Sequence, residues 1–400
     1  MTTLLIILAA PSLVIGFLEL AYYPLAVLFA THRHRMPVFA SYPPLVTVVV
    51  PAYNEARVLE NCVESILAAD CPRLELVLVD DGSTDATWEV MRRYAGRPGI
   101  TVVTQDNAGK GAALNTGLRL ATGEIVCFVD ADGNFTRDTI SRLLRGFDRW
   151  DVGAVCGNDE PVNLDRLQTR LLALLTHGTA FVRRALARIG CLTIVSGNIG
   201  AFRMDVLRSV GGFAEGMLGE DLELTWRVHR AGYRVNFVPQ AKVYAEVPST
   251  VGALWRQRVR WARGHVQTAR MHRSMFGRAR YGRIGWYLPV NAFAMLVAPV
   301  LQLVVLVLGV SLVAAGVVAP PSGLPAVLLA VGLGGALVWV CFGVALDRAG
   351  RDLRFLYVLP LLPVFSVMMG LATLAALVAE ARGTPKHWNK MKRTGVVSRR

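Results

Sequence analysis

The chain has 400 residues, 53% of them hydrophobic, and its mean hydropathy is +0.42. These values exceed those of an ordinary soluble domain and predict a membrane protein with a soluble middle part. The formal net charge of +14 does not indicate nucleic-acid binding, because the basic residues cluster beside apolar stretches and no nucleic-acid-binding motif accompanies them.

The first apolar stretch, residues 3–30, contains a single charged residue, Glu19. A helix needs about 20 apolar residues to cross a bilayer, so we predict an N-terminal transmembrane helix over residues 1–30. A cleaved signal peptide is less favoured, because no basic residues precede the run and the run is too long. The polar and mixed residues 31–255 that follow have the length of one catalytic domain.

Strand and helix patterns alternate at the start of this domain. The predicted strands cover residues 45–50, 74–79, 101–103 and 125–129, and the predicted helices cover residues 55–69, 83–95 and 109–121. This alternation predicts an α/β fold with a mostly parallel sheet and helices on both faces.

Three predicted strands end in polar clusters. These read Pro-Ala-Tyr-Asn-Glu at 51–55, Asp-Asp-Gly-Ser at 80–83 and Asp-Ala-Asp at 130–132. Parallel strands bring such ends to one edge of the sheet, where open α/β sheets bind ligands. The carboxylates at 130–132 suit Mg²⁺ or Mn²⁺, whose other positions take water and phosphate oxygens. Taken alone, the same residues also fit an ordinary polar turn.

The first two clusters and the following loop predict a nucleotide site. Tyr53 can stack on a base, and Glu55 and Asp81 can accept hydrogen bonds from base or ribose donors. Lys110, in Asn-Ala-Gly-Lys-Gly at 107–111, can reach a phosphate, although this loop lacks the glycine spacing of a P-loop. The alternatives are packing for Tyr53 and a solvated loop lysine for Lys110.

The second half of the domain carries a glycine-rich connection at 196–200 and an acidic helix start at 218–224. Asp221 in that first helical turn is a candidate general base for a sugar hydroxyl. The alternative is favourable placement of acids at a helix N-terminus, which contributes only about 0.3–1 kcal/mol.

Residues 256–284 form a basic segment that begins with Gln257-Arg-Val-Arg-Trp261 and has nine arginines and no acidic residue over 256–283. Guanidinium groups bind diphosphate oxygens, and an indole covers the apolar face of a sugar ring. An amphipathic helix on the lipid headgroups is a second interpretation, and both can hold together.

Apolar stretches at 285–317, 324–346 and 355–380 predict C-terminal transmembrane segments over 285–380, followed by a basic tail over 381–400. Basic flanks on both sides of the domain place it in the cytoplasm of a multi-pass protein of the cell membrane. Three full membrane spans after a cytoplasmic domain would place the basic tail outside the cell, so we expect that one of the three stretches does not cross the membrane completely. Pro360 and Pro363 make 355–380 the candidate for a re-entrant hairpin.

In combination, the five motifs at 51–55, 80–83, 130–132, 220–221 and 257–261 resemble the processive, membrane-embedded family 2 glycosyltransferases, which include cellulose, chitin, hyaluronan and poly-N-acetylglucosamine synthases. The Gln-x-x-Arg-Trp signature at 257–261 is the most specific of them.

The resemblance implies a GT-A type fold and a role for each matching residue. It implies Asp221 and Glu220 as catalytic residues, Asp132 as the metal ligand, and Trp261, Gly197 and Asn198 at the acceptor. For the donor nucleotide it implies contacts from Pro51, Tyr53, Glu55, Asp81, Lys110, Asp130, Gln257 and Arg260. Mg²⁺ or Mn²⁺ is the implied cofactor.

The predicted function is inverting transfer of a sugar from a UDP-sugar, with UDP-N-acetylglucosamine as the expected donor, to a growing β-linked polysaccharide that leaves through the protein's own channel. The alternative is transfer of one sugar to a lipid or lipid phosphate. The expected partners are the nucleotide sugar, the polysaccharide, membrane lipids and a small accessory membrane subunit, with no nucleic acid. A transporter or receptor is less favoured, because the spans lack intramembrane charge pairs.

Overall fold

The computed structural model describes residues 38–39, 42–317, 337–385 and 393–396. The predicted N-terminal helix at 1–30 and most of the apolar stretch at 324–346 lie outside the described residues. So does most of the basic tail, apart from 381–385 and 393–396.

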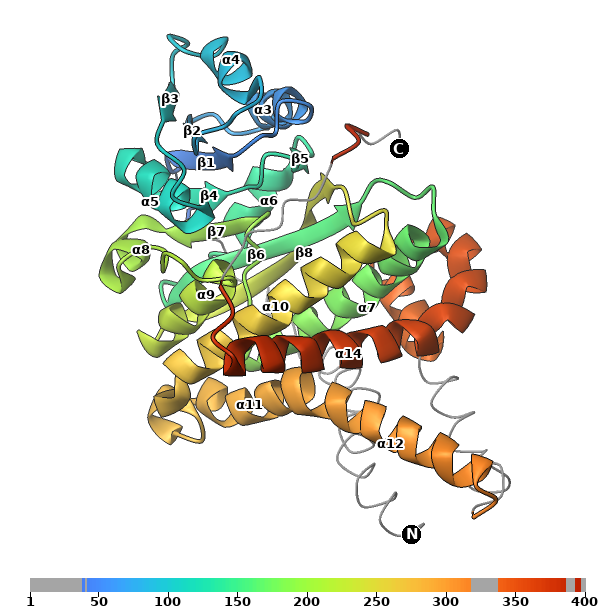
Figure 1. The fold of residues 1–400 in the computed structure, drawn as a ribbon. Coiled ribbons are helices and arrows are strands. Elements are labelled where there is room, and N and C mark those ends of the chain that lie inside the picture. Colours follow the sequence, from blue (N-terminus) through green and yellow to red (C-terminus); the bar gives the residue numbers. More distant parts are fainter. Residues whose placement is uncertain (1–37, 40–41, 318–336, 386–392, 397–400) are drawn as a thin grey trace.

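An eight-stranded sheet in the order β3-β2-β1-β4-β7-β6-β8-β5 forms the centre of the domain (Figure 1). The strands are β1 (Val46–Ala52), β2 (Leu74–Asp80), β3 (Ile100–Thr104), β4 (Ile125–Phe128), β5 (Asn134–Phe135), β6 (Val152–Pro161), β7 (Gly200–Arg203) and β8 (Arg234–Ala245). The four strands expected from the sequence are therefore present at nearly the expected positions.

The sheet is mixed, whereas the sequence predicted a mostly parallel one. β1 pairs in parallel with β2 and β4, and β2 pairs in parallel with β3. β7 then runs antiparallel to both β4 and β6, and β5 runs antiparallel to β8, while β6 and β8 are parallel. The prediction fails in the second half because β7 inserts between β4 and β6, a long-range pairing that no local pattern reveals.

Helices cover both faces of the sheet, as predicted. They are α3 (Leu59–Leu67), α4 (Thr87–Arg92), α5 (Lys110–Leu120), α6 (Thr139–Arg145), α7 (Leu167–Ile189), α8 (Met204–Val210) and α9 (Glu220–Arg230). Alternate residues of β1 enter opposite cores: Val49 joins the core that includes α5, α7 and α9, and Val48 and Val50 join the core that includes α3 and α6. This two-sided burial explains why the strand is apolar throughout.

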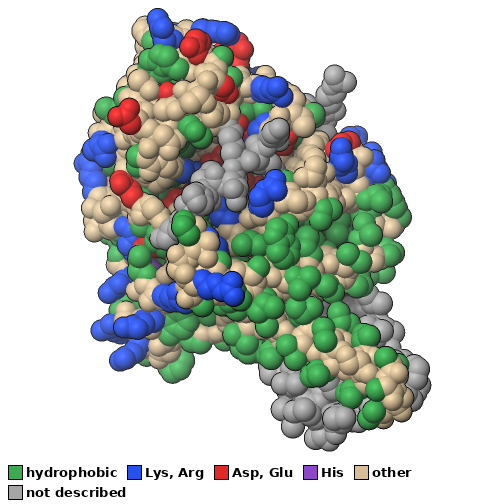
Figure 2. All heavy atoms as spheres, viewed as in Figure 1, with side chains coloured by type: hydrophobic (Ala, Val, Ile, Leu, Met, Phe, Trp, Pro, Cys, Tyr) green, Lys and Arg blue, Asp and Glu red, His purple; other side chains and the backbone are tan. Residues whose placement is uncertain are grey.

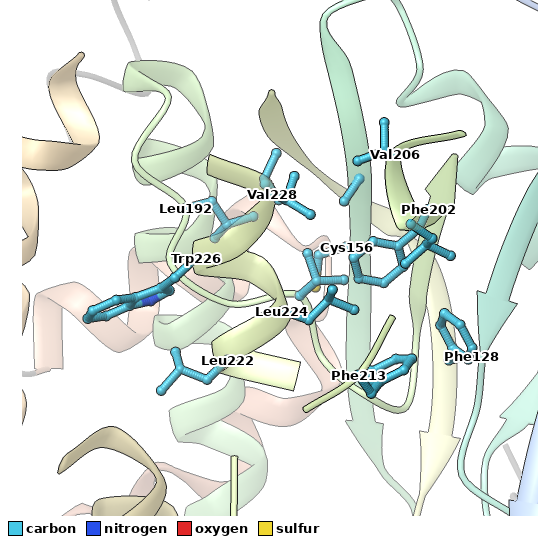
Figure 3. Packing of buried hydrophobic residues seen from close by; sticks show 14 of the residues in the cluster. Phe128, Cys156, Leu192, Phe202, Val206, Phe213, Leu222, Leu224, Trp226 and Val228 are labelled. Carbon is cyan, nitrogen blue, oxygen red and sulfur yellow. The ribbon is translucent and has the colours of Figure 1, made fainter. Parts of the chain in front are cut away.

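The core between α9 and the sheet fixes the position of α9 (Figure 3). Phe128 of β4 contacts Phe213 edge-to-face, with 4.7 Å between ring centroids. From α9, Leu222, Leu224 and Trp226 are buried in the same cluster. Because α9 is held along its length, its acidic first turn has a defined place at the sheet edge.

Helices dominate the C-terminal part. They are α10 (Val251–Met271), α11 (Arg283–Ala292), a π-helical turn (Phe293–Val297), α12 (Ala298–Ala314), a short helix (Leu337–Leu346), a 3₁₀ segment (Gly350–Leu361) and α14 (Leu362–Ala381). Within the described residues, two helical stretches, Arg283–Ala314 and Gly350–Ala381, are long and apolar enough to cross a membrane. These two stretches support membrane association only weakly, and the predicted multi-pass topology stays a prediction.

The molecular surface separates apolar and basic regions. Figure 2 shows hydrophobic side chains gathered over α12 and α14, and Lys and Arg side chains near the turn between α10 and α11. Exposed arginines of that turn are Arg273, Arg278, Arg280 and Arg283. Adjacent apolar and basic surfaces are typical of a segment at the lipid headgroups.

Buried ion pairs join the domain to its C-terminal helices. Arg263 of α10 binds Glu380 of α14, with 2.7 Å between Nε and Oε1. His177 of α7 contacts Asp347 at 2.7 Å and Asp352 at 3.1 Å. These contacts connect α7 and α10 to C-terminal residues that lie more than 100 positions later in the chain.

Candidate active site

A cavity of about 460 Å³ opens at the carboxyl ends of the central strands and extends between α7 and α10. It brings together residues from distant motifs. Of the residues that the sequence singled out, the cavity is lined by Glu55, Lys110, Asp130, Asp132, Gly197, Asn198, Glu220, Asp221, Gln257, Arg260 and Trp261.

Lys110 links two acidic motifs at the centre of the cavity. Its Nζ lies 2.5 Å from Asp130 and 3.4 Å from Glu220. Burial opposes the charged form of Lys110, but Asp130, Glu220 and Asp221 outweigh that effect and raise the pKa of Lys110. Burial also raises the pKa of Glu220, Lys110 lowers it, and Asp221 raises it further. The lysine therefore offsets negative charge that would otherwise repel a phosphate.

Asp221 is held in place at the first turn of α9. Its Oδ2 accepts a hydrogen bond from the backbone N–H of Gly197 at 3.2 Å, and its Oδ1 accepts one from Leu222 at 2.8 Å. The neighbouring Asn198 accepts from the backbone N–H of Asp130 at 3.2 Å, so the 196–198 loop joins both acidic motifs. Asp221 lines the cavity and is not fully buried, so its carboxylate can meet a substrate hydroxyl.

Asp132 lies deeper and is only 5% exposed. Burial raises its pKa to about 6, although Arg393 lowers it. Its buried Oδ2 lies 2.9 Å from an Nη of Arg393 without hydrogen-bond geometry. A buried carboxylate oxygen without a donor fits a divalent cation. Among the described residues, no cluster of three carboxylate, imidazole or thiolate groups forms a complete metal site, so substrate oxygens and water would supply further ligands.

The tail residues 393–396 cover this end of the cavity. Glu246 accepts hydrogen bonds from the backbone N–H groups of Thr394, Gly395 and Val396 at 2.7–3.1 Å. Arg393 also donates to the carbonyl of Glu246 at 2.9 Å. The contact aligns Arg393 with Asp132.

Helix α10 forms the opposite wall and begins after a Thr250 cap, whose hydroxyl accepts from the N–H of Ala253. Gln257, Arg260 and Trp261 line the cavity, and Trp261 is 45% exposed. The guanidinium of Arg258 lies 4.5 Å from the ring centroid of Trp261.

Three predicted donor residues are not among those that line the cavity. Pro51 is buried within β1, and Tyr53 is 38% exposed at the strand end. Asp81 is 3% exposed, and its carboxylate accepts from Gln105 and from the backbone N–H groups of Ala108 and Gly109 at 2.8–3.0 Å. In the structure Asp81 thus holds the loop before Lys110.

Several lining residues were missed by the sequence reasoning. They include Asn158, Asp159, Glu160, Arg183, Glu246 and Arg393. Asp159 and Glu160 lie at the C-terminal end of β6, just before its last residue, Pro161. Carboxylates that follow an apolar run are also the pattern from which Asp130 and Asp132 were predicted, so this pattern could have indicated them. No local sequence pattern could have predicted Arg393 as a cavity residue, because it reaches the cavity through a contact with Asp132, which lies far away in the sequence.

Comparison with known proteins shows which proteins the domain is similar to. Residues 47–211 match the family model Glycosyl transferase family 2. Poly-beta-1,6-N-acetyl-D-glucosamine synthases of Staphylococcus aureus (strain COL) and Staphylococcus epidermidis are 32% and 30% identical over 225 residues, which cover 55% of this chain and 54% of each relative. The matched part thus spans about half the length of these curated relatives. Residues 47–211 of this chain are therefore similar to family 2 glycosyltransferases.

A solved structure matches more of the chain. A mannosyltransferase from Pyrobaculum calidifontis, in complex with GDP-Man and Mn²⁺, is 27% identical, with a TM-score of 0.67. The match covers 94% of this chain and 99% of that one. The likeness extends beyond the family 2 domain to the C-terminal helices, and the fold is GT-A-like.

Proposed function

We propose that this protein transfers a sugar, with inversion, from UDP-N-acetylglucosamine to a growing β-linked polysaccharide. The observation that carries the proposal is the convergence of the Asp130-Ala-Asp132, Glu220-Asp221 and Gln257-x-x-Arg-Trp261 motifs, with Lys110, on one cavity. The names of the staphylococcal relatives support the donor sugar and the polymeric product. The product leaves through the membrane segments.

The reaction needs a base, a held leaving group and a positioned acceptor. Asp221 takes the proton from the acceptor hydroxyl, and the hydroxyl oxygen attacks the anomeric carbon as the bond to the diphosphate breaks. Arg260 and Lys110 offset the charge that develops on the leaving diphosphate. Trp261 presents its indole face to the acceptor sugar.

Asp132 would hold the Mg²⁺ or Mn²⁺ ion with its buried Oδ2. The bound ion would supply further positive charge at the diphosphate. Support comes from the solved mannosyltransferase, which contains Mn²⁺.

Radiolabel transfer from UDP-N-acetylglucosamine and GDP-mannose tests the proposal, using the full chain in membranes with Mn²⁺ and with EDTA. We expect a ladder of labelled oligomers with UDP-N-acetylglucosamine and no transfer in EDTA. Transfer from GDP-mannose alone, or transfer that persists in EDTA, would refute the donor or the cation requirement.

A second candidate is transfer of one sugar to a lipid or lipid-phosphate acceptor. It is favoured by the basic and apolar character of the cavity wall at Arg258, where α10 meets α14. One discrete lipid-linked product in the same assay would select this candidate.

A further inference from the structure

Arg258 is a cavity-lining cation for which the described residues provide no carboxylate. Its Nε is buried without a hydrogen-bond partner. Two other arginines of the cavity form ion pairs: Arg183 lies 3.6 Å from Asp159, and Arg393 lies 2.9 Å from Asp132. Burial lowers the pKa of Arg258 to about 10, and no acidic group counteracts it.

Aromatic rings hold this guanidinium in place. Its carbon atom lies 4.5 Å from the centroid of Trp261 and 5.6 Å from that of Phe365. Cation–π contacts of this kind contribute about 0.5–2 kcal/mol, less than the cost of burying a charge without an anion. The rings therefore position Arg258 but do not neutralise it.

Helical geometry places Arg258 away from the donor. At about 100° per residue, Trp261 lies between Arg258 and Arg260, which project roughly 160° apart. Arg260 lines the cavity together with Glu220 and Asp221, and its charge lowers the pKa of Glu220. Arg258 instead faces Phe365 of α14, within the apolar stretch Gly350–Ala381. An acceptor whose sugar lies on Trp261 thus has its next group beside Arg258, toward the membrane.

We propose that Arg258 binds the phosphate that joins the acceptor sugar to a lipid carrier. The inference rests on the proposed sugar transfer and, for the acceptor, on the second candidate, the lipid phosphate, in place of the polysaccharide. Charge-assisted hydrogen bonds from a guanidinium to a phosphate are strong and specific. The apolar side chains of Leu172, Leu175 and Ala253 line the same cavity and suit the lipid chain. A neutral polysaccharide supplies no anion at this position.

Binding of farnesyl phosphate, farnesol and inorganic phosphate to the full chain in nanodiscs tests this proposal. We expect farnesyl phosphate to bind about 10–100-fold more tightly than farnesol, as one or two charge-assisted bonds imply. Inorganic phosphate, which lacks the chain, should bind weakly. Arg258→Gln should remove the preference for farnesyl phosphate over farnesol, and Arg258→Lys should keep part of it.

Arg270→Gln is the matched control, because Arg270 lies on the same helix with an exposed side chain and does not line the cavity. Equal affinity of the wild type for farnesol and farnesyl phosphate would overturn the proposal, and this comparison needs no variant. An unchanged preference in Arg258→Gln, or inorganic phosphate binding as tightly as farnesyl phosphate, would also overturn it. So would displacement of farnesyl phosphate by a glucuronic acid oligosaccharide, because that result assigns the site to an acidic polymer.

UDP binding in the presence of Mn²⁺, measured on the same samples, separates this inference from the proposed function. If the wild type does not bind UDP, the proposed donor site is contradicted. A preference for farnesyl phosphate over farnesol in the same samples would still support the phosphate site at Arg258. Normal UDP binding without a phosphate preference would contradict the inference alone.

Discussion

At the residue scale, the two acids of the Glu220-Asp221 pair differ in environment. Glu220 is 4% exposed and lies 3.4 Å from Lys110, whereas Asp221 accepts a hydrogen bond from the Gly197 backbone at the cavity wall. Lys110 forms an ion pair with the Glu220 carboxylate, so the Asp221 carboxylate remains available to a substrate hydroxyl. This difference assigns the role of base to Asp221 in the proposed reaction.

Asp221→Asn should lower the rate of transfer about 10²–10⁴-fold, the range expected for loss of a general base. Donor affinity should stay nearly unchanged, because Lys110 and Arg260 remain. Single-turnover transfer and equilibrium binding of UDP-N-acetylglucosamine measure the two quantities. Asp205→Asn, at an exposed carboxylate outside the cavity, serves as control. A parallel fall in donor affinity would count against the role.

Arg393→Ala should increase the affinity for Mn²⁺. The guanidinium lies 2.9 Å from Oδ2 of Asp132, the oxygen proposed for the cation, and two positive charges cannot share it. Electron paramagnetic resonance of free Mn²⁺ measures the affinity without turnover. Arg399→Ala removes a charge from the same basic tail and is the control. Equal Mn²⁺ affinity of wild type and Arg393→Ala would show that the ion does not displace this contact.

At the element scale, two glycines bring α9 and α10 into backbone contact. A Cβ atom at Gly264 would lie 3.0 Å from the Cα and N atoms of Gly219, closer than nearly all Cβ contacts in proteins, so one helix would have to shift by a few tenths of an ångström. Gly219 precedes Glu220 directly, and Gly264 lies one turn after Arg260. The contact therefore sets the distance between the acidic pair Glu220-Asp221, for which we propose the catalytic role, and Arg260 of α10.

Gly264→Ala should separate the two helices, lowering kcat and destabilising the fold by about 1–3 kcal/mol. Gly252→Ala is the matched control, since its nearest neighbour is the flexible Arg256 side chain at 3.6 Å and alanine favours the helix by about 1 kcal/mol. Thermal unfolding and kcat are measured for both. Wild-type kcat in Gly264→Ala would show that the spacing has no catalytic role.

Elements that depend on local sequence patterns could be predicted, whereas those that depend on contacts between distant segments could not. β1, β2 and β4 were predicted because β-branched runs are local, and the ends of parallel neighbours must meet at one edge. The place of β7 between β4 and β6 depends on long-range pairing, from Phe128 with Gly200 to Ile125 with Arg203, and no local sequence pattern predicts it. The strand end predicted Asp81 at the nucleotide, and that role stays a prediction, whereas its hydrogen bonds to the later loop at Ala108 and Gly109 could not be predicted from a local pattern.

At the scale of the whole molecule, buried charges connect the domain that contains the sheet to the C-terminal helices. His177 of α7 is fully buried between Asp347 and Asp352. Burial opposes protonation of His177, but hydrogen bonds to the two carboxylates outweigh it and raise the pKa to about 9. The charged imidazole therefore stabilises the joined state.

Stability should fall as the pH rises from about 6.5 to above 9. The contribution of His177 is complete below its unfolded pKa and is lost as the pH passes the folded value; the shift corresponds to about 3 kcal/mol. Thermal unfolding of the full chain in detergent at pH 6, 8 and 9.5 measures this trend. His177→Gln should flatten the trend between pH 6.5 and 9. A variant with the wild-type pH dependence would assign the trend to other groups.

The central claim is that the cavity at the sheet edge performs glycosyl transfer. The most direct measurement is release of UDP from UDP-N-acetylglucosamine, together with transfer of the labelled sugar, for the full chain and for Asp221→Asn with Mn²⁺ present. We predict equal amounts of UDP and transferred sugar in the wild type and formation of both products about 10²–10⁴-fold more slowly in the variant. The claim would be contradicted if Asp221→Asn released UDP and transferred sugar at the same rates as the wild type.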